Sequence, residues 1–185
     1  MPAQIFFGAG SLDNLGSAPL PGAKALIVIG GTSVRRLGYL DRVQALLKNQ
    51  GVESVVFDKV QPNPVVEHVM EAAALARETG CDFVVGLGGG SSMDSAKSIA
   101  VMAANPGTYW DYIQGGSGKG LPIPNKPLPI VCRDWNGSGS VDRHHEGGYA
   151  GEDRLRLQGH LPHHVHRGSG ADAFRTAQID GLPGL

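Results

Sequence analysis

The sequence lacks three features that would place a protein in a large class at once. No run is long and apolar enough to span a membrane, and the N-terminal MPAQIFFGAG has no basic segment of the kind that begins a signal peptide. Cysteine is scarce, and Cys81 and Cys132 form neither a disulfide framework nor a metal-binding pattern. We therefore expect a soluble, cytoplasmic protein with reduced cysteines.

A concentration of charge of one sign is also missing. The 185 residues hold 16 Lys and Arg against 17 Asp and Glu, so the net charge is close to zero. Before residue 127 the only adjacent basic pair is Arg35-Arg36, which leaves no basic stripe for a nucleic-acid backbone. Neither nucleic acid nor a membrane is an expected partner.

The first 131 residues contain a regular alternation of short apolar runs and amphipathic segments. The apolar runs predict strands at residues 25–31, 52–58, 81–90 and 127–131. Helical spacing predicts helices at residues 40–51, 65–80 and 91–105. Strands that are apolar on both faces and alternate with helices indicate a parallel sheet covered by helices. The predicted fold class is therefore α/β.

Three consecutive glycines, Gly88, Gly89 and Gly90, end the third apolar run and lead into the third helix. Ligands of parallel sheets bind outside the carboxyl ends of the strands, and glycine lets a ligand approach the backbone closely. The following helix would direct its N-terminal N–H groups at a phosphate, with Ser91 as N-cap and Asp94 in the capping-box position. The alternative is that the glycines only make a tight strand-to-helix turn.

Longer stretches around this turn resemble the N-terminal domain of the iron-type, group III alcohol dehydrogenases. GCDFVVGLGGGSSMDSAKSIAVMAANPG is similar to that family's Gly-Cys-Asp, strand, Gly-Gly-Gly-Ser, x-x-Asp, x-x-Lys segment. FFGAGSLDNLG, LGYLDRV, VVFDKVQPNPVVEHV and NPGTYWDYI match other parts of the domain in order, from about residue 5 to residue 131. The resemblance implies a Rossmann-like NAD(P)-binding domain, a helical C-terminal domain that binds catalytic Fe²⁺ or Zn²⁺, and reversible oxidation of alcohols to aldehydes or ketones.

The same resemblance implies the residues of the cofactor site. They are Gly88, Gly89, Gly90, Ser91, Asp94 and Asn63. The first four would hold the diphosphate of the coenzyme, and the other two would lie near the coenzyme. The segment QIFFGAG at residues 4–10 is similar to a strand that pairs two subunits in the family, so a homodimer is one expected assembly.

One position departs from the family and bears on the choice of coenzyme. Members specific for NAD commonly carry Asp after the first of these strands, and the corresponding residue here is Gly30. No carboxylate at that position repels a 2′-phosphate, while Arg35 and Arg36 can pair with one. The expected coenzyme is NADP or NAD, with NADP favoured. The alternative is that both arginines are solvated on a helix face.

After Val131 the composition changes and the resemblance stops. Residues 133–185 hold six of the seven histidines and no lysine, and neither helical nor strand periodicity persists. Residues 132–185 are therefore expected to form an irregular tail, separate from the NAD(P)-binding domain of residues 1–131. Three interpretations are open: a metal site in HHE (144–146) or HLPHHVH (160–166), a natural disordered tail, or translation out of frame.

The out-of-frame interpretation is favoured because the residues of the tail are compatible with a family-like sequence in another reading frame. Codons permitted for residues 132–185, read one nucleotide later, spell Thr-Gly-Ala-Glu-Val, Val-Asp-Pro-Glu-Leu and Thr-Ala-Tyr-Gln-Gly-Phe in the order in which the family continues. The metal ligands of the family, an Asp and three His, come later still, so neither metal ligands nor catalytic residues are assigned to this truncated chain. Two functions remain open: a metal-activated alcohol dehydrogenase, or a non-catalytic nucleotide-binding remnant.

Overall fold

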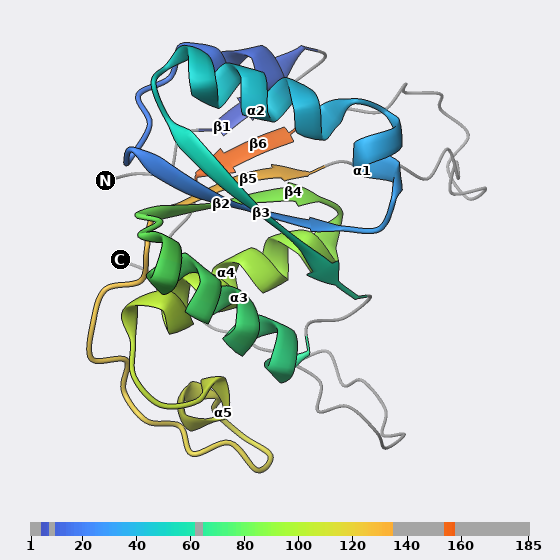
Figure 1. The fold of residues 1–185 in the computed structure, drawn as a ribbon. Helices are drawn as coiled ribbons and strands as arrows, with labels where there is room; N and C mark the ends of the chain where they lie inside the picture. Colours follow the sequence, from blue (N-terminus) through green and yellow to red (C-terminus); the bar gives the residue numbers. More distant parts are fainter. Residues whose placement is uncertain (1–4, 8–9, 62–64, 135–153, 158–185) are drawn as a thin grey trace, which may run out of the picture.

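The computed structural model describes residues 5–7, 10–61, 65–134 and 154–157. These residues form a six-stranded sheet with the strand order β1-β6-β5-β4-β2-β3 (Figure 1). The strands are β1 (Ile5–Phe7), β2 (Lys24–Gly30), β3 (Glu53–Val60), β4 (Phe83–Gly88), β5 (Ile130–Asp134) and β6 (Arg154–Leu157). Strands β3, β2, β4 and β5 are parallel to one another, and β6 pairs in antiparallel fashion with both β5 and β1.

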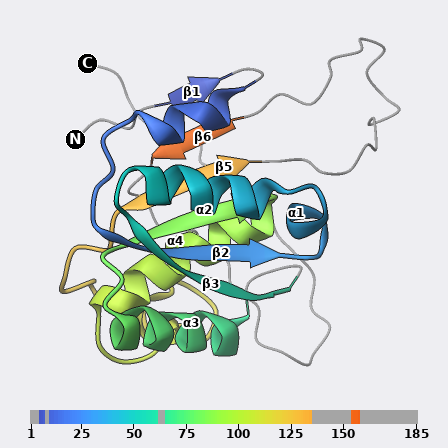
Figure 2. The same ribbon diagram turned by 45° about the horizontal axis from the view of Figure 1, so that its top comes forward.

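Helices connect the parallel strands and cover both faces of the sheet. The helices are α1 (Ser33–Arg36), α2 (Tyr39–Asn49), α3 (Val66–Thr79), α4 (Gly90–Ala104) and α5 (Tyr109–Tyr112), and a 3-10 helix spans Ser11–Gly16. Helix α2 and the 3-10 helix lie on one face, and α3 and α4 lie on the other (Figure 2). In the part of the chain that the structure describes, no helix is both long and apolar enough to cross a bilayer.

Strand β2 shows why the sheet is apolar on both faces. Ala25, Ile27 and Ile29 pack in the core beneath α2, whereas Leu26 and Val28 pack in the core beneath α3 and α4. Successive side chains of a strand point to opposite faces, so a continuous apolar run is what a doubly covered strand requires. The predicted α/β fold with a parallel sheet is therefore confirmed.

The observed structure differs from the sequence expectations at the edge beyond β5. Strand β5 extends past residue 131, and Arg154–Leu157 forms β6 inside the segment that was expected to be irregular. Leucine and arginine alternate in these four residues, which is the period of a strand. A strand there also supplies backbone partners to β5, whose edge would otherwise be open.

Asp82 ties the amino ends of β2 and β4 together. Its carboxylate accepts hydrogen bonds from the backbone N–H groups of Ala23 and Lys24, at 2.8 and 2.9 Å. The backbone N–H of Asp82 in turn donates to the carbonyl oxygen of Lys24 at 2.9 Å. The aspartate of the Gly-Cys-Asp motif therefore has a structural role, at the edge of the sheet opposite the glycine triplet.

Helix α4 packs so closely against β4 that a side chain at position 86 of the strand would not fit between them. An ideal Cβ built on Gly86 of β4 would lie 2.9 Å from the Cβ of Ala96 and 3.3 Å from the Sγ of Cys132. Both neighbours are buried, so neither can move aside into solvent. Glycine at position 86 therefore sets the distance between the helix and the sheet.

We predict that Gly86→Ala destabilises the protein by about 1–3 kcal/mol, because the added methyl group overpacks the contact between α4 and β4. Denaturant unfolding monitored by circular dichroism measures this change. The double variant with Ala96→Gly removes the opposing methyl group and should lose less stability than the two single variants lose together. Strictly additive losses would show that this contact is not the cause.

Candidate functional site

Two loops meet at the carboxyl edge of the sheet, where the direction of the chain reverses. From β2 the chain crosses through α2 to β3 on one side, and from β4 it crosses through α4 to β5 on the other side. These two connections lie on opposite faces of the sheet (Figure 2). Ligands of open parallel sheets bind at such a reversal, so the expected crevice lies at the carboxyl ends of β2 and β4.

The N-terminus of α4 opens at this crevice. Gly89 is the N-cap, with an extended backbone (φ −77°, ψ −172°), and no side chain caps the helix. An N-terminal turn directs backbone N–H groups and the positive end of the helix dipole outward. A helix terminus of this kind can receive a phosphate-type anion, and here it lies at the switch point between β2 and β4.

The expected N-cap was wrong by two residues. Helix α4 begins at Gly90, so Ser91 lies in its first turn and forms no capping box with Asp94. Glycine is accepted at an N-cap almost as well as serine, and Gly89 takes that position here. The two residues therefore remain candidates for ligand contact only.

Gly88 must be glycine for two reasons. Its φ of 141° lies in a region that other residues rarely adopt, and an added Cβ would lie 2.7 Å from the Oγ of Ser92. Gly90 is different, because an ideal Cβ there would meet nothing within 4 Å. The first glycine is required by the fold, whereas the third leaves open space in front of the helix.

The loop after β2 lies against the same helix turn. An ideal Cβ on Gly30 would come within 3.2 Å of the Oγ of Ser92, which places the end of β2 beside the first turn of α4. The next residue, Gly31, has a φ of 70° and nothing within 4 Å of an ideal Cβ. Open space therefore adjoins the backbone of both loops, at Gly31 and at Gly90.

Asp94 lies one turn into α4, and Asn63 lies outside the described residues. The carboxylate of Asp94 is 3.1 Å from the Nζ of Lys97, and its side chain is 45% exposed. Its backbone carbonyl accepts a hydrogen bond from the Oγ of Ser98 at 2.9 Å. Of the residues expected to bind the coenzyme, the structure thus brings together the glycine triplet and Ser91, with Asp94 close behind.

A buried phenol lies behind the same helix. The Oγ of Ser98 is 3.0 Å from the hydroxyl of Tyr109, whose side chain is completely buried. Burial raises the pKa of Tyr109, and the hydrogen bond to Ser98 opposes this shift only in part. Tyr109 therefore stays a neutral phenol that packs α5 against α4, and we assign it no catalytic role.

Sequence reasoning missed one charged contact at the mouth of the crevice. The Nη2 of Arg35 in α1 is 2.7 Å from the Oδ2 of Asp58 in β3. Position 30 itself carries no carboxylate, as expected, but the neighbouring strand supplies one beside Arg35. The signal was present in the sequence, since Asp58 ends an apolar run predicted to be a strand.

The described residues do not fit a metal centre. They contain no group of three or more His, Cys, Asp or Glu side chains placed to hold a metal ion. The histidines of segments 144–146 and 160–166 lie outside the described residues.

The fold is a doubly covered α/β sheet in which an uncapped helix N-terminus and two glycine-containing loops meet at the switch point. The family model described as "Iron-containing alcohol dehydrogenase" matches residues 2–133, and the chain belongs to this family. The match stops two residues beyond position 131, where the sequence resemblance was expected to end. The predicted relationship is confirmed.

Characterised relatives and a solved structure agree with this assignment. The chain is 38% identical over 114 residues to the NADPH-dependent butanol dehydrogenase of Clostridium saccharobutylicum, covering 62% of this chain and 29% of the relative. It is 36% identical over 126 residues to the NADH-dependent butanol dehydrogenase A of Clostridium acetobutylicum, covering 66% and 32%. A crystal structure of an archaeal alcohol dehydrogenase from a Red Sea brine pool superposes with a TM-score of 0.63 at 38% identity, covering 68% and 32%. The chain thus spans about a third of the length of these proteins.

We predict that Gly88→Ala lowers the free energy of unfolding by about 1–3 kcal/mol, because alanine is strained at this positive φ. The contact with Ser92 adds to that loss. Thermal unfolding measures the effect, and Ser92→Gly in the same chain should recover only the part caused by the contact. A Gly88→Ala protein as stable as the wild type would contradict the backbone geometry described here.

Proposed function

We propose that this chain binds a nicotinamide dinucleotide, NAD or NADP, in the crevice between β2 and β4. The observation that carries the proposal is the N-terminus of α4, which has no side-chain cap and opens at the switch point beside two glycine loops. Backbone N–H groups of the first helical turn would donate to the diphosphate. Gly89 and Gly90 would let it approach without a Cβ in the way.

The chemistry of the proposed function is the interconversion of alcohols with aldehydes or ketones. A bound nicotinamide ring accepts or donates the hydride of that reaction. The part of the chain that contributes is the positioning surface formed by Gly88–Ser91, with Asp94 near the coenzyme. Relatives named as NADPH-dependent and NADH-dependent butanol dehydrogenases support both the coenzyme type and an alcohol substrate.

A second candidate function is coenzyme binding without turnover. It rests on the family resemblance, in which the metal ligands come after the matched residues 2–133. In the family resemblance, the metal site belongs to a separate C-terminal domain. A homodimer through the edge of the sheet at β1 also remains a proposal.

Calorimetric titration of the full chain with NADP and NAD tests the binding proposal. We expect saturable binding of at least one of them at a single site. Absence of binding to a sample shown by circular dichroism to be folded would overturn it. Steady-state reduction of the coenzyme with a primary alcohol and added Fe²⁺ or Zn²⁺ then separates the two candidates, since turnover above background rules out the non-catalytic one.

We predict that Gly90→Ala weakens coenzyme binding about tenfold, which corresponds to about 1.4 kcal/mol, because the methyl group enters the space where the diphosphate would lie. Stability should be unchanged or higher, since alanine favours a helix more than glycine does. Gly51→Ala is the control: Gly51 has a φ of 75° and lies before β3, so stability should fall while binding stays constant. Unaltered binding by Gly90→Ala would count against the proposed site.

A further inference from the structure

We propose that the ion pair between Arg35 and Asp58 sets the preference of this chain between NADP and NAD. Arg35 would attract the 2′-phosphate that distinguishes NADP, and Asp58 would repel it. The inference rests on the proposed coenzyme site and goes beyond it, because the site geometry alone binds the diphosphate common to both molecules. Names of relatives do not decide the question, since NADPH-dependent and NADH-dependent proteins match at 38% and 36% identity.

The location of the pair follows from the strand register. Gly30 at the end of β2 pairs with Val60 of β3, so Asp58 lies two residues before the end of the neighbouring strand. Arg35 lies in α1, which begins three residues after β2 ends. The two side chains therefore meet across the β2 loop, on the side of the crevice away from β5.

The adenosine half of a dinucleotide would reach this pair. The first turn of α4, where the diphosphate is proposed to bind, touches the position of Gly30 through Ser92. Beyond Gly30 the loop offers Gly31, with open space around it, before the chain reaches Arg35. A ribose attached to the diphosphate would pass Gly31 and then Thr32 and Ser33, and would present its 2′ position near the two charges.

The geometry leaves Arg35 able to bind a further anion. The contact joins the Nη2 of Arg35 to one oxygen of Asp58, and the side chains are 49% and 54% exposed. A guanidinium group carries five N–H donors in a fork that matches phosphate, so donors remain for a second partner. A doubly charged phosphate would gain from Arg35, whereas a ribose hydroxyl would gain little.

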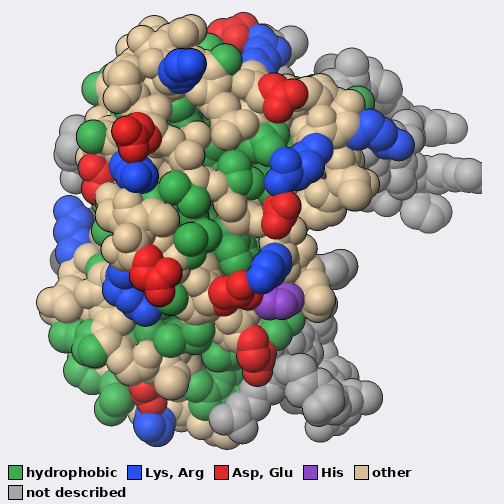
Figure 3. All heavy atoms as spheres, viewed as in Figure 1, with side chains coloured by type: hydrophobic (Ala, Val, Ile, Leu, Met, Phe, Trp, Pro, Cys, Tyr) green, Lys and Arg blue, Asp and Glu red, His purple; other side chains and the backbone are tan. Residues whose placement is uncertain are grey.

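Asp58 would weaken NADP binding, whereas Arg35 would strengthen it. Its carboxylate neutralises part of the charge of Arg35 and repels a phosphate that approaches the same guanidinium group. The neighbouring Arg36 is exposed and makes no ion pair within the described part of the chain, so it does not offset Asp58 through a fixed contact. Basic and acidic side chains are interspersed over the face shown in Figure 3, so the discrimination is local to this pair.

Two substitutions that each replace a charged side chain with a neutral polar one test the proposal by calorimetry with NADP and NAD on the full chain. Arg35→Gln should weaken NADP binding about tenfold and change NAD binding less than about twofold, as expected for the loss of one charge-assisted phosphate contact. Asp58→Asn should strengthen NADP binding by about two- to fivefold, with NAD again nearly unchanged. Both effects should shrink as salt concentration rises, because the groups are exposed.

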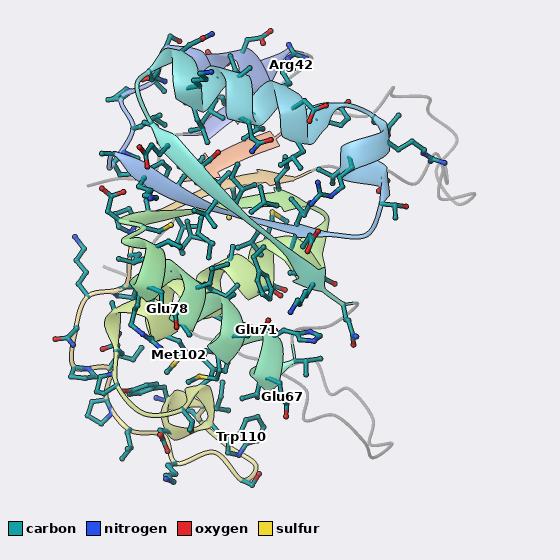
Figure 4. The ribbon with its side chains drawn as sticks, viewed as in Figure 1. Arg42, Glu67, Glu71, Glu78, Met102 and Trp110 are labelled. Atoms are coloured by element: carbon teal, nitrogen blue, oxygen red, sulfur yellow. The ribbon has the colours of Figure 1, made fainter. Side chains whose placement is uncertain are left out.

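A second exposed ion pair of the same type serves as control. Arg42, labelled on α2 in Figure 4, contacts Asp13 of the 3-10 helix. The two side chains are 47% and 61% exposed, so Arg42→Gln and Asp13→Asn remove comparable charges. Neither control should change the ratio of the two dissociation constants.

The possible results separate this inference from the proposed function. A wild-type chain that is folded but binds neither coenzyme overturns both. Binding of either coenzyme with a ratio that Arg35→Gln and Asp58→Asn leave unchanged overturns the inference and leaves the proposed site standing. A ratio that moves in the same direction for both variants also overturns it, because opposite shifts are required.

Discussion

The contact between α4 and β4 is the constraint on which the rest of the structure depends. Glycine at positions 86 and 88 removes the side chains that would hold the helix away from the sheet. The helix therefore begins as soon as the strand ends, and its first turn stays at the carboxyl edge of the sheet. A wider separation would move the first turn of α4, where the diphosphate is proposed to bind, away from the end of β2.

In the proposed function, the groups around this helix turn would distinguish one coenzyme from the other. Backbone at Gly31 and Gly90 offers space for a ligand, while Arg35 and Asp58 place opposite charges where the β2 loop ends. The first feature suits a diphosphate of any dinucleotide, and the second can distinguish a ribose hydroxyl from a phosphate.

Much of this arrangement could be predicted from the sequence, because its signals are local. The run of β2, which is apolar on both faces, and the glycine triplet at the end of β4 can each be recognised from a few neighbouring residues. The pairing of Arg35 with Asp58 could not be predicted in the same way, since it joins residues 23 positions apart through the order of the strands. The predicted N-cap of α4, Ser91, lay two residues beyond the observed one, Gly89, because Ser and Gly are both good N-caps. The strand at Arg154–Leu157 was missed because four alternating residues are a weak signal.

The most direct test of the central claim is to follow the backbone amides of the full chain by heteronuclear NMR while a nicotinamide dinucleotide is added. The account predicts that the largest shifts occur at the first turn of α4, from Gly89 to Ser92, with further shifts at Gly30 and Gly31. Shifts confined to the pocket lined by Gln44, Lys48 and Glu53, at the opposite edge of the sheet, would contradict it.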